Sequence, residues 1–350
     1  MADFIILSIV ILIIALISNS DKRLSKIGFW TCFVIFMLMS AFRGPTVGND
    51  TTEYLRIFNE ANAIDFDASN SRYEIGYILL NQLLGKFTVE GQIVFAVAGA
   101  FIFFSFGRFI LKYSKSPWLS LILFFFYGFF VFSMSAIRQS IAIGILLFAY
   151  DYILQKKFVK FLMLLLLATA FHMTAMFFIF AYLVSYLKPT LKTYLIILSV
   201  TAALFICFNL LLSNLFLLFE TYEGYENEYG GGARIAIIIY ISIVSLVFLF
   251  SYFTRKRIPA AVMPVYNKEF LMVFVALCTY ILALNINILD RIANYYNVFS
   301  LILLPTAIHY QRYYTRLSMT ISVVIAFFAY AAVLLWLRPN WNSVFPYYIY

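Results

Sequence analysis

Long apolar segments, separated by short polar or basic connections, constrain this chain more than any other feature. Each is about as long as the α-helix that crosses a ~30 Å hydrocarbon layer at about 1.5 Å per residue. Apolar residues make up 64% of the 350 residues and charged residues 12%, whereas a soluble globule is roughly half apolar. The runs are continuous and do not alternate with polar residues, which favours helices over membrane β-strands. The sequence therefore predicts an all-α, polytopic membrane protein with one integral domain over residues 1–350.

The apolar segments predict about twelve transmembrane helices, some of them short or re-entrant. They are expected near residues 3–18, 27–42, 92–111, 117–134, 139–154, 158–171, 172–187, 194–214, 233–253, 270–287, 292–308 and 317–337.

Basic residues are concentrated in alternate connections between these spans. By the positive-inside bias, those connections are predicted to be cytoplasmic. Both chain ends then lie on the outer side, and residues 158–187 form a hairpin whose outer turn holds His172. The net charge of +9 is thereby explained without nucleic acid as a partner. The basic residues of these connections are Lys22, Arg23, Lys26, Arg108, Lys112, Lys115, Lys156, Lys157, Lys160, Lys188, Lys192, Arg255, Lys256, Arg257, Lys268, Arg312 and Arg316.

Residues 43–90 form the first long polar connection, which we expect to be an outer loop with amphipathic or re-entrant helices. Arg43 closes the second span, and Pro45 follows closely because proline, which has no N–H to donate, ends helices. An arginine at the mouth of an apolar span is costly unless something pairs with it. Arg43 and Asp50 are therefore expected at the bilayer surface, where Arg43 either binds an anionic substrate or contacts lipid phosphates.

Acidic and aromatic residues later in this loop suggest further chemistry. Glu74 lies between two tyrosines; its carboxylate could take a proton from a sugar hydroxyl, or it could simply begin a solvated helix. Asp65 and Asp67 have the acidic spacing found in metal-dependent membrane glycosyltransferases. Two carboxylates on a polar loop are usually only solvated, so no metal site is predicted.

Arg138 and His172 are also expected on the outer side. Arg138 begins the fifth span, where a helix N-terminus presents free N–H groups and a partial positive charge. Its planar guanidinium suits a phosphate oxyanion, although contact with lipid phosphates is the alternative. A lone histidine is often a hydrogen-bonded core residue, but His172 is predicted at the same level as Arg43 and Arg138, which favours a role in a site.

Two later segments are also predicted to face outward. Residues 219–232 are acidic, rich in tyrosine and end in glycines, so they predict a mobile outer loop that is either a lid over a glycan or simply solvated. Arg291 begins the eleventh span, and Tyr295 lies one helical turn after it.

Blocks of residues in this order resemble the EpsG-like membrane proteins, which include Wzy-type O-antigen and exopolysaccharide polymerases. The resemblance runs from about residue 40 to residue 296, and every block falls on the predicted outer face. The matching blocks are Phe42-Arg43, Val47-Gly48-x-Asp50-Thr51-x-x-Tyr54, Tyr73-Glu74-x-Gly76-Tyr77, Ile137-Arg138-Gln139-x-Ile141-Ala142, Phe171-His172-x-Thr174-Ala175 and Arg291 with Tyr295.

The resemblance implies a GT-C-like membrane glycosyltransferase of the bacterial inner membrane. It implies transfer of a growing glycan from undecaprenyl diphosphate to a lipid-linked repeat unit on the periplasmic or extracellular face. A carboxylate would deprotonate the acceptor hydroxyl and His172 would orient or share that proton, while fixed guanidinium charges would make a metal or other cofactor unnecessary. In these roles the resemblance places Asp50, Glu74 and His172 as catalytic residues, Arg43, Arg138 and Arg291 on the diphosphate, and Tyr54, Tyr77, Tyr225 and Tyr295 on the acceptor.

Other functions stay open at this point. A lipid-linked oligosaccharide flippase would have a similar number of spans, but transporters place their sites near the membrane midplane. An O-antigen ligase or a membrane acyltransferase using His172 as base is a further alternative. Expected partners are undecaprenyl-diphosphate-linked glycans and membrane lipids, together with a chain-length regulator and a flippase.

Overall fold

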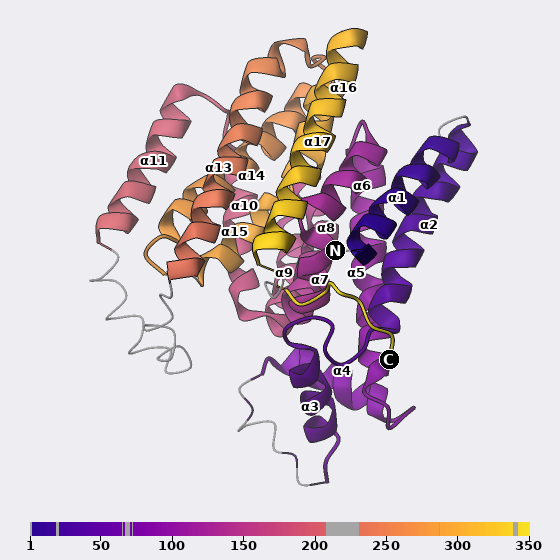
Figure 1. Ribbon diagram of the computed structural model, residues 1–350. Helices are drawn as coiled ribbons and strands as arrows, with labels where there is room; N and C mark the ends of the chain where they lie inside the picture. Colours follow the sequence, from indigo (N-terminus) through magenta and orange to yellow (C-terminus); the bar gives the residue numbers. More distant parts are fainter. Residues whose placement is uncertain are drawn as a thin grey trace. The chain divides into compact units, whose positions relative to one another are not determined.

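The computed structural model is built almost entirely of helices over the residues it describes, which are 2–18, 21–64, 66, 71, 73–207, 231–286, 288–338 and 342–350 (Figure 1). These helices form two compact units. The first unit comprises Met1–Phe148, Leu166–Met173 and Arg312–Tyr350, and the second comprises Ala149–Leu165 and Thr174–Gln311. Two helices, α8 (Ile137–Leu154) and α9 (Phe158–Phe171), contribute residues to both units.

The first unit is organised around a phenylalanine core. Helix α1 packs on α2, α2 on α5, and α17 on α6. Phe36 is fully buried, and its ring centroid lies 4.7 Å from that of Phe130 and 5.9 Å from that of Phe103. Buried aromatic rings supply much of the contact area in such a core. These helices are α1 (Ala2–Ser18), α2 (Lys22–Ala41), α5 (Gln92–Tyr113), α6 (Pro117–Phe126), α7 (Phe129–Ser135) and α17 (Tyr313–Leu337).

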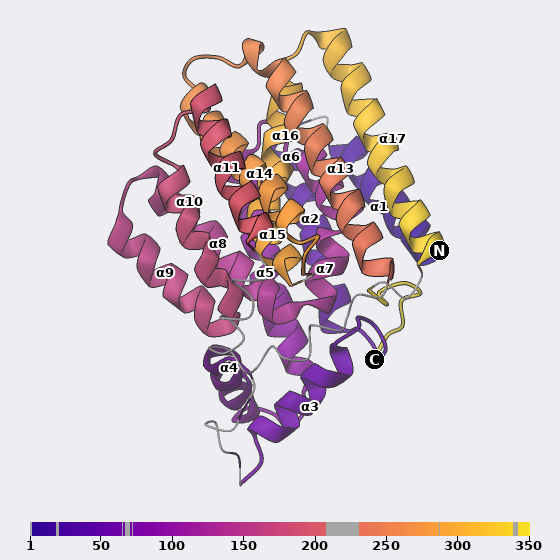
Figure 2. The same ribbon diagram turned by 90° about the vertical axis from the view of Figure 1, so that its left-hand side faces the viewer.

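Two shorter helices occupy the connection between α2 and α5. Helix α3 (Thr51–Ala61) and helix α4 (Ile75–Gly85) lie side by side, and both views show them past the ends of α2 and α5 that this connection joins (Figures 1 and 2). Helix α3 buries Tyr54, Ile57 and Phe58 on one face, which is the pattern of an amphipathic helix. The segment 43–90 therefore contains two helices, while its position on the outer side of a membrane stays a prediction.

The second unit is built around α14, which packs against α11, α13 and α15, as Figure 2 shows for α11 and α13. Helix α16 packs on both α13 and α14. The helices of the second unit are η2 (Met173–Phe178), α10 (Ile179–Val184), α11 (Leu191–Ile206), α13 (Gly231–Thr254), η4 (Arg255–Arg257), α14 (Met263–Leu282), α15 (Leu289–Asn297) and α16 (Ser300–His309).

Six helices in the described part of the chain are long and apolar enough to cross a membrane, or seven if the bent pair α6 and α7 forms one span. The chain is thus a multi-pass membrane protein. Twelve crossings and the GT-C-like architecture stay predictions. Several predicted spans are shorter or broken helices: α6 and α7 meet at 52°, residues 172–187 contain a 3₁₀ turn before α10, and residues 292–308 are divided between α15 and α16.

Candidate active site

Arg43 lies in the interior of the first unit. Its side chain is completely buried, with the guanidinium carbon 3.9 Å from the centroid of the Phe95 ring and one guanidinium N–H donated to the Met134 carbonyl. Burial disfavours the charged form and lowers the pKa of Arg43 to about 10, against the opposing effect of nearby tyrosine hydroxyls. The arginine therefore fastens the loop after α2 to the end of α7. In this position its guanidinium is enclosed by protein, and its binding of a diphosphate stays a prediction.

The loop that follows is held against the same helix end. Gly48 has a φ of +92°, and a Cβ there would lie 3.0 Å from the Met134 carbonyl oxygen, so this close approach suits glycine. Asp50 occupies the N-cap position of α3 with an exposed side chain and no side-chain cap hydrogen bond. The structure does not include Asp50 in the cluster formed by the other two predicted catalytic residues.

Tyr54 and Tyr77 are buried and position the helices of the first unit. The Tyr54 hydroxyl accepts a 3.1 Å hydrogen bond from the backbone N–H of Ile137, which satisfies a free donor at the start of α8. The Tyr77 ring meets the Tyr54 ring edge to face at 5.6 Å. Both side chains are at most 3% exposed, so neither ring offers a face for stacking on an acceptor sugar.

Glu74 is placed by the first turn of α4. It is the N-cap residue of that helix, in an extended conformation, and Gly76 follows two residues later. A Cβ at Gly76 would lie 2.7 Å from the carbonyl oxygen of Ala170, which is closer than real Cβ atoms come. The glycine thus allows α4 to approach the end of α9, immediately before His172. This explains why a glutamate and a glycine two residues apart are needed here.

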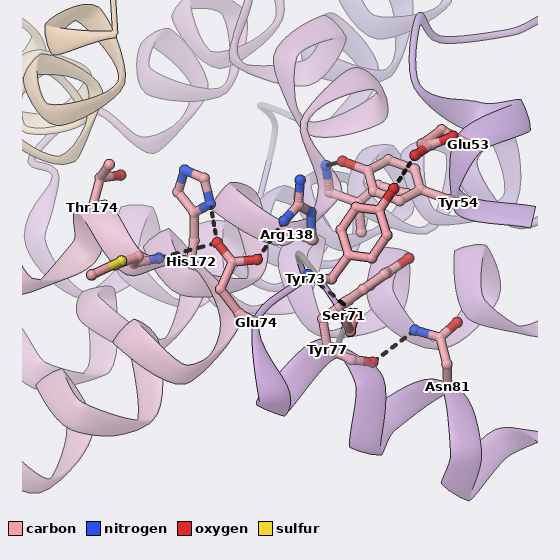
Figure 3. A network of polar contacts seen from close by, with 12 residues as sticks. Glu53, Tyr54, Ser71, Tyr73, Glu74, Tyr77, Asn81, Arg138, His172 and Thr174 are labelled. Carbon is pink, nitrogen blue, oxygen red and sulfur yellow. Dashed lines mark hydrogen bonds and ion pairs between the residues drawn. The ribbon is translucent and has the colours of Figure 1, made fainter. Parts of the chain in front are cut away.

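Glu74, Arg138 and His172 form one cluster in the first unit, which we call the carboxylate cluster (Figure 3). The Oε2 atom of Glu74 pairs with the guanidinium of Arg138. The Oε1 atom lies 3.1 Å from Nδ1 of His172 and accepts a 3.2 Å hydrogen bond from the backbone N–H of Met173. The side chains of Arg138, Glu74 and His172 are 23%, 18% and 9% exposed. The sequence blocks around residues 74, 138 and 172 therefore converge on one partly open site.

The charge of Glu74 is strongly favoured in this cluster. Burial alone would raise the pKa of Glu74, but the hydrogen bond with His172 and the positive charge of Arg138 outweigh burial and lower that pKa to about 2. An ionised carboxylate can only accept hydrogen bonds, so Nδ1 of His172 carries the proton in this pair. In the neutral ring the lone pair then belongs to Nε2, the atom that can accept a proton.

A second layer supports the cluster from α3. The guanidinium carbon of Arg138 lies 5.1 Å from the centroid of the Tyr73 ring. The Tyr73 hydroxyl is bonded to Glu53 and accepts a 2.9 Å hydrogen bond from Arg56. Sequence reasoning placed Tyr73 in a matching block beside Glu74, but it did not assign Glu53 or Arg56 to the site. The available signals were the position of Tyr73 beside Glu74 and the three-residue spacing of Glu53 and Arg56 on one face of α3.

The remaining predicted site residues lie elsewhere. Arg291 is half-buried at the start of α15 and belongs to the second unit, as does Tyr295, which is 1% exposed and hydrogen-bonds through its hydroxyl to Thr174 at 3.1 Å. Tyr225, Asp65 and Asp67 are outside the described residues. Where side chains are described, no group of three or more His, Cys, Asp or Glu residues could hold a metal ion.

Comparison with known proteins adds a family to this geometry. No curated protein and no solved structure matches the chain. The model of the EpsG family matches residues 26–349, a range that includes every member of the carboxylate cluster. Since the match covers nearly the whole sequence, the chain belongs to the EpsG family.

Proposed function

We propose that this protein is a polysaccharide polymerase of the Wzy type. It would transfer a growing glycan from undecaprenyl diphosphate to a lipid-linked repeat unit on the outer side of the bacterial inner membrane. The observation that carries the proposal is the carboxylate cluster, in which a glutamate links a histidine and an arginine in a multi-pass member of the EpsG family.

The proposed reaction needs one proton acceptor and one binding site for anionic charge. A hydroxyl of the acceptor sugar attacks the anomeric carbon of the donor glycan. The new carbon–oxygen bond forms as the bond from the anomeric carbon to the diphosphate breaks, and undecaprenyl diphosphate leaves. The hydroxyl proton passes to the protein, and the leaving diphosphate gains negative charge that must be stabilised.

His172 is the better candidate for the proton acceptor. A carboxylate whose pKa is about 2 is a weak base at neutral pH, whereas imidazoles titrate near neutrality and suit general-base catalysis there. Glu74 fixes the Nδ1-protonated form of the His172 ring through the 3.1 Å contact and would stabilise the imidazolium that forms, as carboxylates do in catalytic triads.

Arg138 is the proposed diphosphate ligand. It lies in the first turn of α8, where the helix end adds a partial positive charge, and its guanidinium is partly exposed while still paired with Glu74. A planar guanidinium can bind two phosphate oxygens at once. A donor diphosphate would share Arg138 with Glu74, and the diphosphate role of Arg291, a residue of the second unit, stays a prediction. The proposed partners are undecaprenyl-diphosphate-linked glycans, a flippase and a chain-length regulator.

The test is the length of the surface glycan in cells that carry Arg138→Ala. The matched control is Arg23→Ala, because Arg23 is an exposed arginine in the first turn of α2 in the same unit. With both variants present in the membrane at wild-type levels, we expect Arg138→Ala to lose the glycan ladder while single repeat units still reach the surface.

Two other outcomes would contradict the proposal that the protein is a polymerase. Loss of all surface glycan, with lipid-linked repeat units trapped inside the cell, would indicate a flippase. Long lipid-linked polymer that is not joined to its final acceptor would indicate a ligase. An unchanged ladder would leave Arg138 as a contact to membrane lipid.

A further inference from the structure

The second unit contains a pocket of about 790 Å³ whose wall is rich in basic side chains. Its lining comes from the connection between α8 and α9, the connection between α10 and α11, η4 and the start of α14. We call it the basic pocket and define it by Lys156, Lys188, Arg255 and Lys268, all of which line it.

The charged residues that line the basic pocket are all positive. Four cationic side chains line it, and none of the residues that line it is acidic. Lys268 is half-buried and donates a 3.1 Å hydrogen bond to the Ser185 carbonyl, which fixes its ammonium in the wall. Thr190 lines the pocket and caps α11, so the positive end of that helix also lies at this wall. Such a site attracts anions.

Lys156 occupies a backbone conformation that favours glycine. Its φ is +57°, and the N–H of Lys157 donates to the Tyr152 carbonyl at 2.9 Å, which is the pattern of a helix end with a left-handed residue. A non-glycine residue in this conformation is strained, because its Cβ comes too close to the following carbonyl oxygen. The chain therefore carries a cation at the rim of the pocket at a position where glycine would be more stable.

We propose that the basic pocket binds a phosphate group. Four cations in a lining that contains no acidic residue suit a phosphate, and the Arg255 fork could bind two of its oxygens. The volume is in the range of sites for small molecules or lipid headgroups. The four basic residues belong to connections predicted to be cytoplasmic, where anionic lipid headgroups and soluble phosphates are both available and basic pockets between helices bind such headgroups. This proposal does not depend on the polymerase reaction.

The test measures binding directly. Purified full-length protein is titrated in detergent with phosphatidylglycerol or phosphatidylcholine and followed by native mass spectrometry, and its melting temperature is recorded with and without inorganic phosphate. The test variant is Lys156→Gly/Lys188→Gln. Glycine relieves the strained backbone at residue 156, so we expect this variant to melt no lower than wild type. The control is Lys22→Gln/Lys115→Gln, which removes two exposed lysines of the first unit.

A headgroup site is supported if phosphatidylglycerol binds at least tenfold more tightly than phosphatidylcholine, if the test variant loses that preference and if inorganic phosphate has no effect. A soluble phosphate is supported if inorganic phosphate raises the melting temperature of wild type and control but not of the test variant. Equal binding of the two lipids together with no effect of inorganic phosphate on melting, or binding and melting shifts that are identical in wild type and test variant, would overturn the proposal.

Discussion

At the scale of single residues, the proton chemistry depends on which member of the Glu74–His172 pair accepts the proton. If His172 accepts it, polymerisation by purified protein should fall as the pH decreases below neutrality, because a protonated imidazole cannot accept a second proton. Glu74, with a pKa of about 2, cannot produce a decrease just below neutrality. The measurement is the rate of polymer formation between pH 4.5 and 8.5.

His172→Gln should lower the rate by about 10²- to 10⁴-fold, the usual contribution of general-base catalysis. His309→Gln, the change at the other histidine of the chain, should leave it near wild type. A rate that stays constant down to pH 5 would point to a carboxylate base, as the sequence alone suggested.

The charges of Glu74 and Arg138 also affect stability. Glu74→Gln leaves the partly buried guanidinium without its counter-charge, and we expect a loss of about 1–3 kcal/mol in the free energy of unfolding. The exposed pair of Glu60 and Arg56 should contribute less than about 1 kcal/mol, so Glu60→Gln is the control. The free energies can be compared by thermal or denaturant unfolding in detergent.

The double variant Glu74→Gln/Arg138→Gln separates stability from activity. It has no unpaired charge, so it should unfold at a higher temperature than Glu74→Gln and still be inactive. Because folding lowers the pKa of Glu74, the stabilisation is fully present above about pH 4.5 and is lost as the pH falls toward 2. A double variant that is less stable than either single variant would contradict this electrostatic account.

At the scale of elements, the approach of α4 to the end of α9 determines whether Glu74 reaches His172. Gly76→Ala places a methyl group against the backbone carbonyl of Ala170, which cannot move as a flexible side chain can. We expect α4 to shift away and the rate to fall more than tenfold with the protein still in the membrane, since small misplacements of catalytic groups are costly.

Gly91→Ala is the control for this helix contact, because its new Cβ would meet only the movable side chains of Leu55 and Phe58. A fully active Gly76→Ala would show that the spacing of α4 and α9 is not critical. Glycan ladders and membrane levels of the two variants provide the comparison.

At the scale of the whole molecule, the sequence predicted the membrane class, the helical fold and the family. It also singled out Glu74, Arg138 and His172 by residue type and predicted depth. The sequence could not show that Arg43 is fully buried while these three side chains are partly exposed. Burial depends on tertiary packing, which short motifs do not specify. For the same reason Tyr54 and Tyr77 were expected to contact the acceptor sugar, whereas the structure shows both side chains buried. The sequence did not predict helix breaks such as the 3₁₀ segment before α10. The hydropathy of a segment does not show where an α-helix gives way to a 3₁₀-helix.

The side of the membrane on which a segment lies can be tested directly. The charge bias predicts that α3 lies outside and that the connection between α5 and α6 lies in the cytoplasm. We replace the three native cysteines and introduce Glu60→Cys or Lys115→Cys, both at exposed positions. A membrane-impermeant maleimide should label Cys at 60 in intact spheroplasts and Cys at 115 only after permeabilisation. The reverse pattern would place the carboxylate cluster on the cytoplasmic side, where polymerisation on an outer-leaflet substrate is impossible, and would overturn the proposed function even if every residue-level prediction held.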